Sequence, residues 1–429
     1  MALSGGLPGG PFEPPDVPFR CLCVSFYRCF VTFRAGFSSY PQKRQPSRFV
    51  TPRSYAFVKD CASLVCAGGR PRYHTSVGVF DRLGSEYEQI VFAHEPTAGL
   101  RAIFAIHSTR LGPALGGTRI WPYTSEDAAL TDVLRLSKAM AYKAAAAGLA
   151  LGGGKAVIIG DPARDKTPDL LQAYGRHVER LGGKYLTTAD AGTTVADLDL
   201  IATTTRYVTG TSHGSGDPSP MTAHGVLHGL AAVAQELWGD PSLEKRHVLI
   251  QGVGKVGGAL ARALAGTGAR LSICDINREH AKALAEEIGA RAVEADSAIA
   301  AECDILAPCA LGPVVTDNTL GTLRCRAVAG AANNQLATPE HGRALAAAGI
   351  LYAPDYVINA GGLINVEDEL HGYDEARARA KTEAIAITLR DVFERARAAG
   401  ITPGEAADRL AEARIRHGAR ALEDGTAPG

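Results

Sequence analysis

A glycine-rich turn between an apolar run and a helical segment constrains the fold of this 429-residue chain more than any other feature. The run 247–251 has the pattern of a buried strand, and the turn 252–257, GVGKVG, follows it and opens the helical segment. The next apolar run ends at Asp275, 23 residues after Gly252. This spacing is typical of a Rossmann-type site, where a helix N-terminus faces a pyrophosphate and a carboxylate binds ribose hydroxyls. We therefore predict a dinucleotide site formed by Gly252, Gly254, Lys255, Val256, Gly257 and Asp275.

Alternating strands and helices on both sides of this turn predict an α/β fold with a doubly wound sheet. Further strands are expected at 304–309, 326–332 and 350–355, and the segment after each should lie at the carboxyl edge that binds the nucleotide. The Asp275 carboxylate would repel a 2′-phosphate, which favours NAD, although Arg278 nearby leaves NADP open.

A second stretch, residues 111–161, places two lysines between glycine-rich turns and a helix. Thr124 is expected to start that helix, with Lys143 on its apolar side near the end. A lysine that extends its stem along apolar surface is the structural alternative. Lys155 follows three glycines and precedes an expected strand at 156–160. A lysine at the mouth of a buried strand is a candidate base, since burial disfavours its charged form.

Three other polar residues are ambiguous from their local pattern alone. Asp190, in the turn after the strand 185–188, would ordinarily be a cap or turn residue. His224 and His228 lie four apart on a helix, but neither an HExxH pattern nor a nearby carboxylate supports a metal site. We expect surface or packing histidines there and no metal.

Several motifs together resemble a known family. They are GGTRIWPYTSEDAALTDVLRLSKAMAYKAAAAGLALGGGK, TTADAGTT, GVGKVGG, DILAPCALG, GAANNQL and YAPDYVINAGGLINV, in one order over roughly residues 77–420. The chain resembles the amino-acid dehydrogenases for leucine, valine and phenylalanine, relatives of glutamate dehydrogenase. This implies a substrate domain and an NAD-binding Rossmann domain, with the active site in the cleft between them.

The resemblance also implies roles for individual residues. Lys155 would be the general base and Asp190 the proton shuttle. The substrate carboxylate would be held by Lys143, Gly116, Gly117 and Asn334. The substrate side chain would face Leu115, Thr188, Leu363 and Val366. The cofactor would be contacted by Ala310, Leu311, Asn333 and Asn359, although turn chemistry is the alternative for the asparagines.

The implied reaction is reversible NAD-dependent oxidative deamination of a branched-chain L-amino acid to its 2-oxo acid and ammonia. Leucine at position 115, where glutamate-specific relatives carry lysine, excludes an acidic side chain. Relatives more often carry smaller residues at 188 and 363, so the pocket here should disfavour phenylalanine. Phenylalanine dehydrogenase, a catalytically inactive NAD-binding regulatory protein and a structural assembly protein are the alternatives.

Composition sets the remaining expectations. Lysine plus arginine and aspartate plus glutamate both number 45, so no global charge points to nucleic acid or a membrane. Residues 1–75, rich in proline, arginine and cysteine, are expected to be a disordered or non-native extension, with a transit peptide as the alternative. We expect a substrate domain at 76–217, completed by C-terminal helices 356–422, and an NAD domain at 218–355. A cytoplasmic homo-oligomer is expected.

Overall fold

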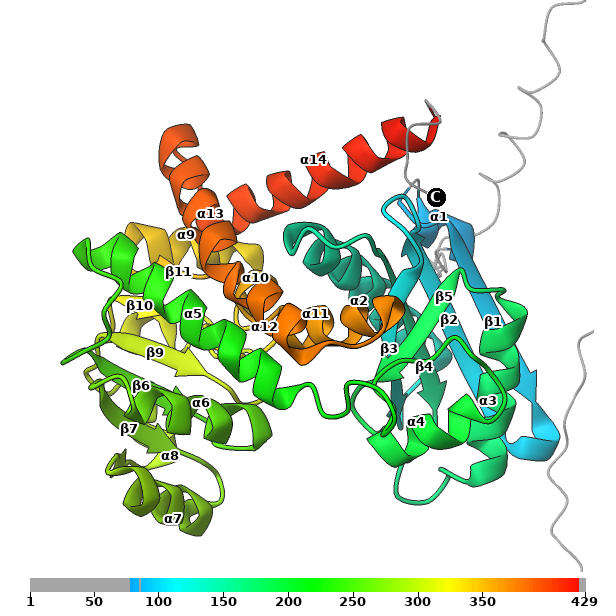
Figure 1. Ribbon diagram of the computed structural model, residues 1–429, viewed down its shortest axis with the longest axis horizontal. Coiled ribbons are helices and arrows are strands. Elements are labelled where there is room, and N and C mark those ends of the chain that lie inside the picture. The colour runs from blue at the N-terminus through cyan, green and yellow to red at the C-terminus, as the bar shows by residue number, and fades with distance from the viewer. Residues whose placement is uncertain (1–77, 85, 424–429) are drawn as a thin grey trace, which may run out of the picture. The chain divides into compact units, whose positions relative to one another are not determined.

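The computed structural model describes residues 78–84 and 86–423, with side chains described up to Gly418. The expected extension 1–75 lies outside the described residues. Two sheets organise the described chain, and helices cover both (Figure 1). This confirms the predicted α/β architecture. Among the described residues, no helix is both long and apolar enough to cross a bilayer.

The first sheet has five strands in the order β1-β2-β4-β3-β5. β1 and β2 pair antiparallel, as do β2 and β4, whereas β3 is parallel to both β4 and β5. The strands are β1 (Gln89–Glu95), β2 (Leu100–Ser108), β3 (Ala114–Trp121), β4 (Gly152–Ile159) and β5 (Tyr185–Ala189). The helices and the 3-10 turn here are α1 (Val79–Leu83), η2 (Pro96–Ala98), α2 (Glu126–Ala146), α3 (Pro168–Arg180) and α4 (Val195–Ala202).

The glycines expected in turns are strand residues of β3 and β4, so that prediction was wrong. A Cβ on Gly153 would lie 2.1 Å from the backbone of Ala141 in α2. On the other face, a Cβ on Gly154 would lie 2.7 Å from the ring of Tyr185. Glycine is therefore required because a helix and an aromatic ring both press against this sheet. As a result, Lys155 lies within β4 and not before its strand.

The helix α2 begins one residue later than expected. Ser125 is its N-cap, and its hydroxyl accepts a hydrogen bond from the backbone N–H of Ala128 at 3.0 Å. Thr124 does not cap the helix. Both residue types are favoured at this position, so the local pattern could not separate them.

The second sheet is entirely parallel, in the order β11-β10-β9-β6-β7-β8. Its strands are β6 (His247–Gln251), β7 (Arg270–Cys274), β8 (Arg291–Ala292), β9 (Ile305–Pro308), β10 (Ala327–Val328) and β11 (Leu351–Tyr352). Its helices are α5 (Ser219–Trp238), α6 (Lys255–Ala265), α7 (Arg278–Ile288), α8 (Ala295–Ala298) and α9 (Pro339–Ala347), with η3 (Leu320–Thr322). Because the chain order reverses between β6 and β9, a ligand crevice is expected at their carboxyl ends.

The C-terminal segment packs on helices of both sheets. It comprises α10 (Asp355–Ile358), α11 (Gly361–Asp368), η4 (Glu369–His371), α12 (Glu375–Glu383), α13 (Ile385–Ala399) and α14 (Pro403–Glu423). α11, α12 and α13 pack against α5, whereas α14 packs against α2 (Figure 1). Arg414 of α14 donates to the carbonyls of Ala145 and Ala146 at the end of α2. The domain boundaries at 217 and 355 stay a prediction.

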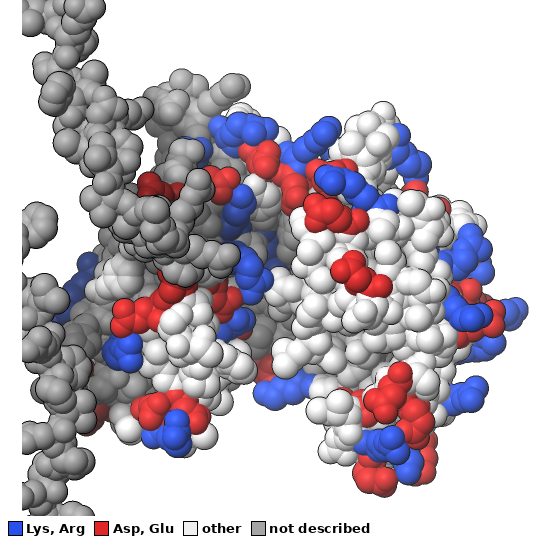
Figure 2. Space-filling view, turned by 180° about the vertical axis from the view of Figure 1, so that it is seen from behind, with Lys and Arg blue, Asp and Glu red and all other residues white. Residues whose placement is uncertain are grey.

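Charge is distributed without a single dominant sign. On the described part of the face in Figure 2, lysine and arginine are interspersed with aspartate and glutamate. This pattern agrees with the equal charge counts of the sequence.

Candidate active site

One face of the first sheet collects the predicted catalytic residues. β3, β4 and β5 are adjacent, with Leu115 of β3 opposite both Gly153 and Leu186. Successive side chains of a strand point to opposite faces, so every second residue shares a face. The face that α2 partly covers carries Leu115, Gly117, Arg119, Gly153, Lys155, Leu186, Thr188 and Asp190.

Lys155 and Asp190 meet on this face. The Nζ atom of Lys155 lies 2.8 Å from Oδ2 of Asp190, which directly follows β5. Lys155 is 6% exposed, so the pair is held largely out of water. The structure therefore brings together the two residues predicted to be catalytic. A direct ammonium–carboxylate contact is a route for proton transfer.

Arg119, two positions after Gly117 in β3, contacts the same carboxylate oxygen of Asp190 as Lys155, and the sequence did not reveal it. Its Nε lies 3.0 Å from Oδ2 of Asp190, and its Nη1 lies 2.9 Å from Oδ2 of Asp132. Burial alone would raise the pKa of Asp190, but the charges of Lys155 and Arg119 hold that pKa well below its usual range. Asp190 is therefore an anion at working pH.

Lys143 reaches toward the second sheet from α2. Its Nζ lies 3.4 Å from Oδ1 of Asn333, which follows β10. Burial lowers the pKa of Lys143 to about 8, opposed by the charge of Asp355 and helped by that of Lys155. Asp355, a buried carboxyl after β11, was also missed; burial raises its pKa. Few groups around Lys143 therefore compensate the positive charge of its ammonium.

The predicted asparagines lie at the carboxyl edge of the second sheet. Asn359 donates from Nδ2 to Oδ1 of Asn333 at 2.8 Å and to the Ala331 carbonyl at 3.0 Å. Its own Oδ1 is buried and has no hydrogen-bond partner among the described residues. Asn334 adopts a left-handed backbone (φ 54°) and accepts a hydrogen bond from Arg135, not from Lys143. A ligand amide would satisfy the Asn359 oxygen.

The glycine turn has the geometry that a dinucleotide requires. Gly252 has φ 91°, and a Cβ on Gly257 would lie 1.9 Å from the Gly252 carbonyl oxygen. Around a Cβ on Gly254, the N-cap of α6, there is open space, so a ligand can approach the helix N-terminus. Asp275 is held at the end of β7 by the backbone N–H of Val253 (2.8 Å) and of Asn277 (2.9 Å). These residues fit a dinucleotide.

The remaining residues predicted to bind the cofactor differ in their contacts and in their exposure to solvent. Ala310 packs so closely against Gly252 that a Cβ on that glycine would lie 2.7 Å from it, and Val256 follows the turn in α6. Lys255 forms an exposed ion pair with Asp217 at 2.9 Å. Leu311 is 97% exposed and touches little of the described chain.

Apolar residues predicted to surround the substrate side chain share one buried cluster. Leu115, Leu363 and Val366 belong to it, as does Leu186, which the sequence reasoning missed. Thr188 lies close by: its Oγ1 is 2.9 Å and Val366 Cγ1 is 3.8 Å from the position of a Cβ on Gly210. Strand alternation would have found Leu186, because it lies opposite Leu115 in β5.

Gly116 and Gly117 follow Leu115 in β3, and Tyr185 on the opposite face of the sheet holds the first of them. The Tyr185 hydroxyl donates to the Gly116 carbonyl at 2.7 Å. A Cβ on Gly117 would lie 2.8 Å from the Asp190 Cβ atom. Any side chain at Gly117 would therefore displace the Asp190 carboxylate. Glycine at this position keeps the sheet face beside Asp190 open.

Two regions of the chain match domains of known proteins. Residues 88–207 match the Glu/Leu/Phe/Val dehydrogenase dimerisation domain, and residues 270–396 match Glutamate/Leucine/Phenylalanine/Valine dehydrogenase. The chain is 52% identical to a leucine dehydrogenase of Thermoactinomyces intermedius, over 79% of this chain and 93% of that protein. It is 50% identical to a valine dehydrogenase of Streptomyces coelicolor, over 77% and 92% of the two chains.

A solved structure gives the same picture of the fold. The crystal structure of L-tryptophan dehydrogenase from Nostoc punctiforme superposes with a TM-score of 0.70 at 44% sequence identity. The similarity covers 78% of this chain and 97% of that one. Both the two-sheet fold and the sequence motifs therefore recur together in one group of proteins.

Proposed function

The chain belongs to the Glu/Leu/Phe/Val dehydrogenase family, and from this premise we propose that it is an NAD-dependent dehydrogenase of branched-chain L-amino acids. The reaction converts the amino acid and water to a 2-oxo acid and ammonium while NAD⁺ accepts a hydride, and one proton is released. The observation that carries the proposal is the Lys155–Asp190 pair on the sheet face beside Lys143, together with the glycine turn. A non-catalytic regulatory protein would have no use for this buried pair.

Lys143 is proposed to bind the substrate carboxylate, and the backbone of Gly116 and Gly117 is proposed to lie close to that carboxylate. A cation that is poorly compensated before substrate arrives gains most when a carboxylate binds. Asn333 positions the ammonium through its side-chain oxygen at 3.4 Å. Asn334, which contacts Arg135, is proposed to approach the carboxylate only once a substrate lies between the two sheets.

In its neutral form, Lys155 is proposed to take the proton from the water that attacks the imine carbon. Asp190 then moves protons to and from the amine, and the 2.8 Å contact lets the two groups exchange a proton directly. Arg119 keeps Asp190 an anion and fixes its orientation through a second contact to Asp132. When NAD is bound, its nicotinamide supplies the hydride acceptor, and the unpaired Asn359 oxygen would orient its carboxamide.

Two wider properties are also proposed. The match to a dimerisation domain supports a homo-oligomer, and a cytoplasmic location is proposed with it. The partners are then small molecules: an L-amino acid, its 2-oxo acid and ammonia.

Discrimination between the nucleotides tests the role of Asp275. We expect kcat/KM with NAD to exceed that with NADP by about 100-fold or more, because a carboxylate beside a 2′-phosphate costs several kcal/mol. Arg278, which could favour the phosphate, is paired with Glu294 at 2.8 Å. Steady-state kinetics with both nucleotides measures the ratio, and Asp275→Ser should reduce it. Equal kcat/KM values in the unmodified protein would contradict the assignment.

The pH dependence of 2-oxo acid binding tests Lys143. Without ammonia, the complex with NADH and a branched 2-oxo acid cannot turn over, so calorimetry gives its Kd. Because the Lys143 pKa is about 8, the ammonium is present below that pH and is lost above it. The affinity should therefore fall as pH rises above 8, by up to about tenfold per pH unit.

Lys143→Arg is the matched control for this titration. Its guanidinium stays charged, so its affinity, whatever its absolute value, should change little between about pH 7 and 9. If the unmodified protein shows the same flat profile, Lys143 does not bind the carboxylate as proposed.

A further inference from the structure

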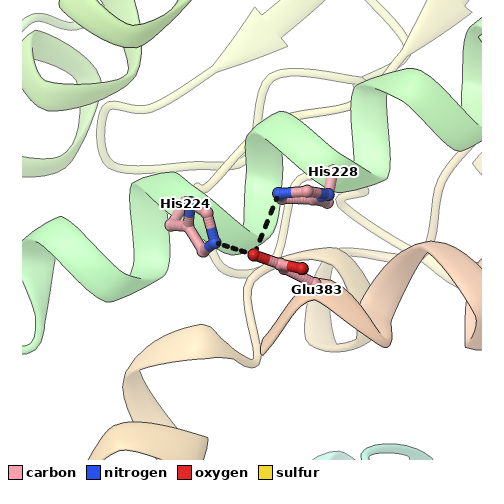
Figure 3. A group of neighbouring side chains, drawn as sticks. All are labelled: His224, His228 and Glu383. Atoms are coloured by element: carbon pink, nitrogen blue, oxygen red, sulfur yellow. Dashed lines mark hydrogen bonds and ion pairs between the residues drawn. The ribbon is translucent and has the colours of Figure 1, made fainter. Parts of the chain in front are cut away.

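Two histidines and a glutamate converge on the side of α5 that faces α12 (Figure 3). His224 and His228 lie one turn apart on α5, with ring centroids 4.6 Å apart. Glu383 is the last residue of α12, and 159 positions separate it from His224. One atom, Glu383 Oε1, lies 3.2 Å from His224 Nε2 and 4.0 Å from His228 Nε2.

The packing between the helices holds these three side chains close together. A Cβ on Gly225, beside His224, would lie 2.7 Å from Ile385 and 3.1 Å from Thr382. The missing side chain lets α5 approach the end of α12, which brings the carboxylate within reach of both rings. The side chains of His224, His228 and Glu383 are 17%, 32% and 47% exposed, so an ion could enter from solvent.

We propose that His224, His228 and Glu383 form a binding site for a zinc-class divalent cation, which goes beyond the proposed dehydrogenase function. Imidazole nitrogen and carboxylate oxygen are ligands that Zn²⁺ prefers, at about 2.0–2.2 Å. Ligand atoms sharing one tetrahedral ion at those distances are about 3.3–3.6 Å apart. The His224–Glu383 separation of 3.2 Å is close to this range, and the His228–Glu383 separation of 4.0 Å must shorten. Water completes the coordination.

The positively charged guanidinium of Arg379 would repel a cation bound by these three residues. Its Nη1 lies 3.4 Å from Nδ1 of His224, and its Nη2 lies 3.2 Å from Glu375. A neutral histidine that binds metal through Nε2 carries its proton on Nδ1, which cannot accept from the guanidinium. On binding, Arg379 must therefore leave His224 and keep only its contact with Glu375. Its charge lowers the affinity, and its removal should raise it.

The ion would link α5, the helix that leads into the second sheet, to α12 of the C-terminal segment. None of the three ligands belongs to the proposed reaction, so turnover should not depend on it. Because the ion binds the folded state, it should raise the melting temperature in proportion to its saturation.

Calorimetric titration of the full chain with Zn²⁺ is the experiment. The unmodified protein should bind one more equivalent than His228→Gln or Glu383→Gln, and its melting temperature should rise with Zn²⁺ more than theirs. Arg379→Gln should bind that equivalent at least threefold more tightly. His280→Gln, a change at an exposed histidine of α7, is the matched control and should retain it. Zinc held by cysteines is the same in all variants and cancels.

Two results would overturn the proposal. One is an equal number of Zn²⁺ equivalents in the unmodified protein and both ligand variants, which would make Glu383 only a hydrogen-bond partner of the histidines. The other is weaker binding in Arg379→Gln than in the unmodified protein. If one ligand variant fails to fold, the other still decides the question.

Discussion

Replacing Lys155 by alanine is expected to lower kcat by about 10²–10⁴-fold, the usual contribution of a positioned acid or base. The residue is 6% exposed and its Nζ lies 2.8 Å from Asp190, so the substitution removes both the proposed base and a charge partner of that carboxylate. NADH affinity should stay near that of the unmodified protein, because Lys155 belongs to the first sheet and the glycine turn to the second. Stopped assays of deamination and a fluorescence titration of NADH measure the two quantities.

Lys138 provides the matched control for this substitution. It lies on α2 as a partly exposed lysine paired with Glu86 at 2.9 Å, and it has no role in the proposed reaction. Lys138→Ala should keep kcat within about twofold, since surface ion pairs contribute little. A Lys155→Ala protein that turns over at the unmodified rate would remove Lys155 from the role of base.

The second large effect concerns the substrate side chain. We expect kcat/KM to be highest for valine or leucine, followed by isoleucine, far lower for phenylalanine, and undetectable for glutamate. Leu115 is 1% exposed and lies in one cluster with Leu363 and Val366, so a second carboxylate would be buried without a partner, at several kcal/mol. Each buried methylene of an apolar side chain gains about 0.8 kcal/mol instead. Valine and leucine should overlap, because one methylene discriminates by only about 1–3 kcal/mol.

Thr188→Ala tests whether pocket size sets this order. It enlarges the pocket at its edge, whereas truncating buried Leu363 would cost about 2–5 kcal/mol of stability and confuse the result. The ratio of phenylalanine to leucine kcat/KM should rise by about tenfold or more. A preference of the unmodified protein for phenylalanine would overturn the size argument, and turnover of glutamate would overturn the argument from Leu115.

The glycine turn and the alternation of elements were predictable because they depend on short-range pattern. Strand, turn, helix and Asp275 lie within thirty positions of one another, and the second sheet contains the expected strands, although β10 and β11 are shorter than expected and β8 was not expected. The strand β3 was not predictable, since Gly116 and Gly117 are as compatible with a turn as with a crowded strand. A Cβ on Gly116 would lie 1.8 Å from the Gly154 carbonyl oxygen of β4, and one on Gly117 would lie 2.6 Å from the Ala189 carbonyl oxygen of β5, so only the close approach of the neighbouring strands explains these glycines.

Two physical reasons explain the residues that the sequence did not reveal. Arg119 follows from the alternation of β3, so misreading that strand as a turn concealed its contact with Asp190. Asp355 of the candidate active site and Glu383 of the proposed cation site come from segments far from Lys143 and His224 in the chain, and only the packing of α10 and α12 brings them close. Conversely, Lys155 and Asp190 were linked by resemblance, not by any spacing in the sequence.

The stoichiometry of the reaction tests the central claim most directly. Purified protein supplied with L-leucine and NAD⁺ should form NADH, ammonia and the branched 2-oxo acid in equimolar amounts. Asp190→Asn, which keeps the size of the side chain but loses the charge held by Lys155 and Arg119, should form all three far more slowly. Absence of NADH with leucine, valine and isoleucine alike, or NADH formation without ammonia, would contradict the account.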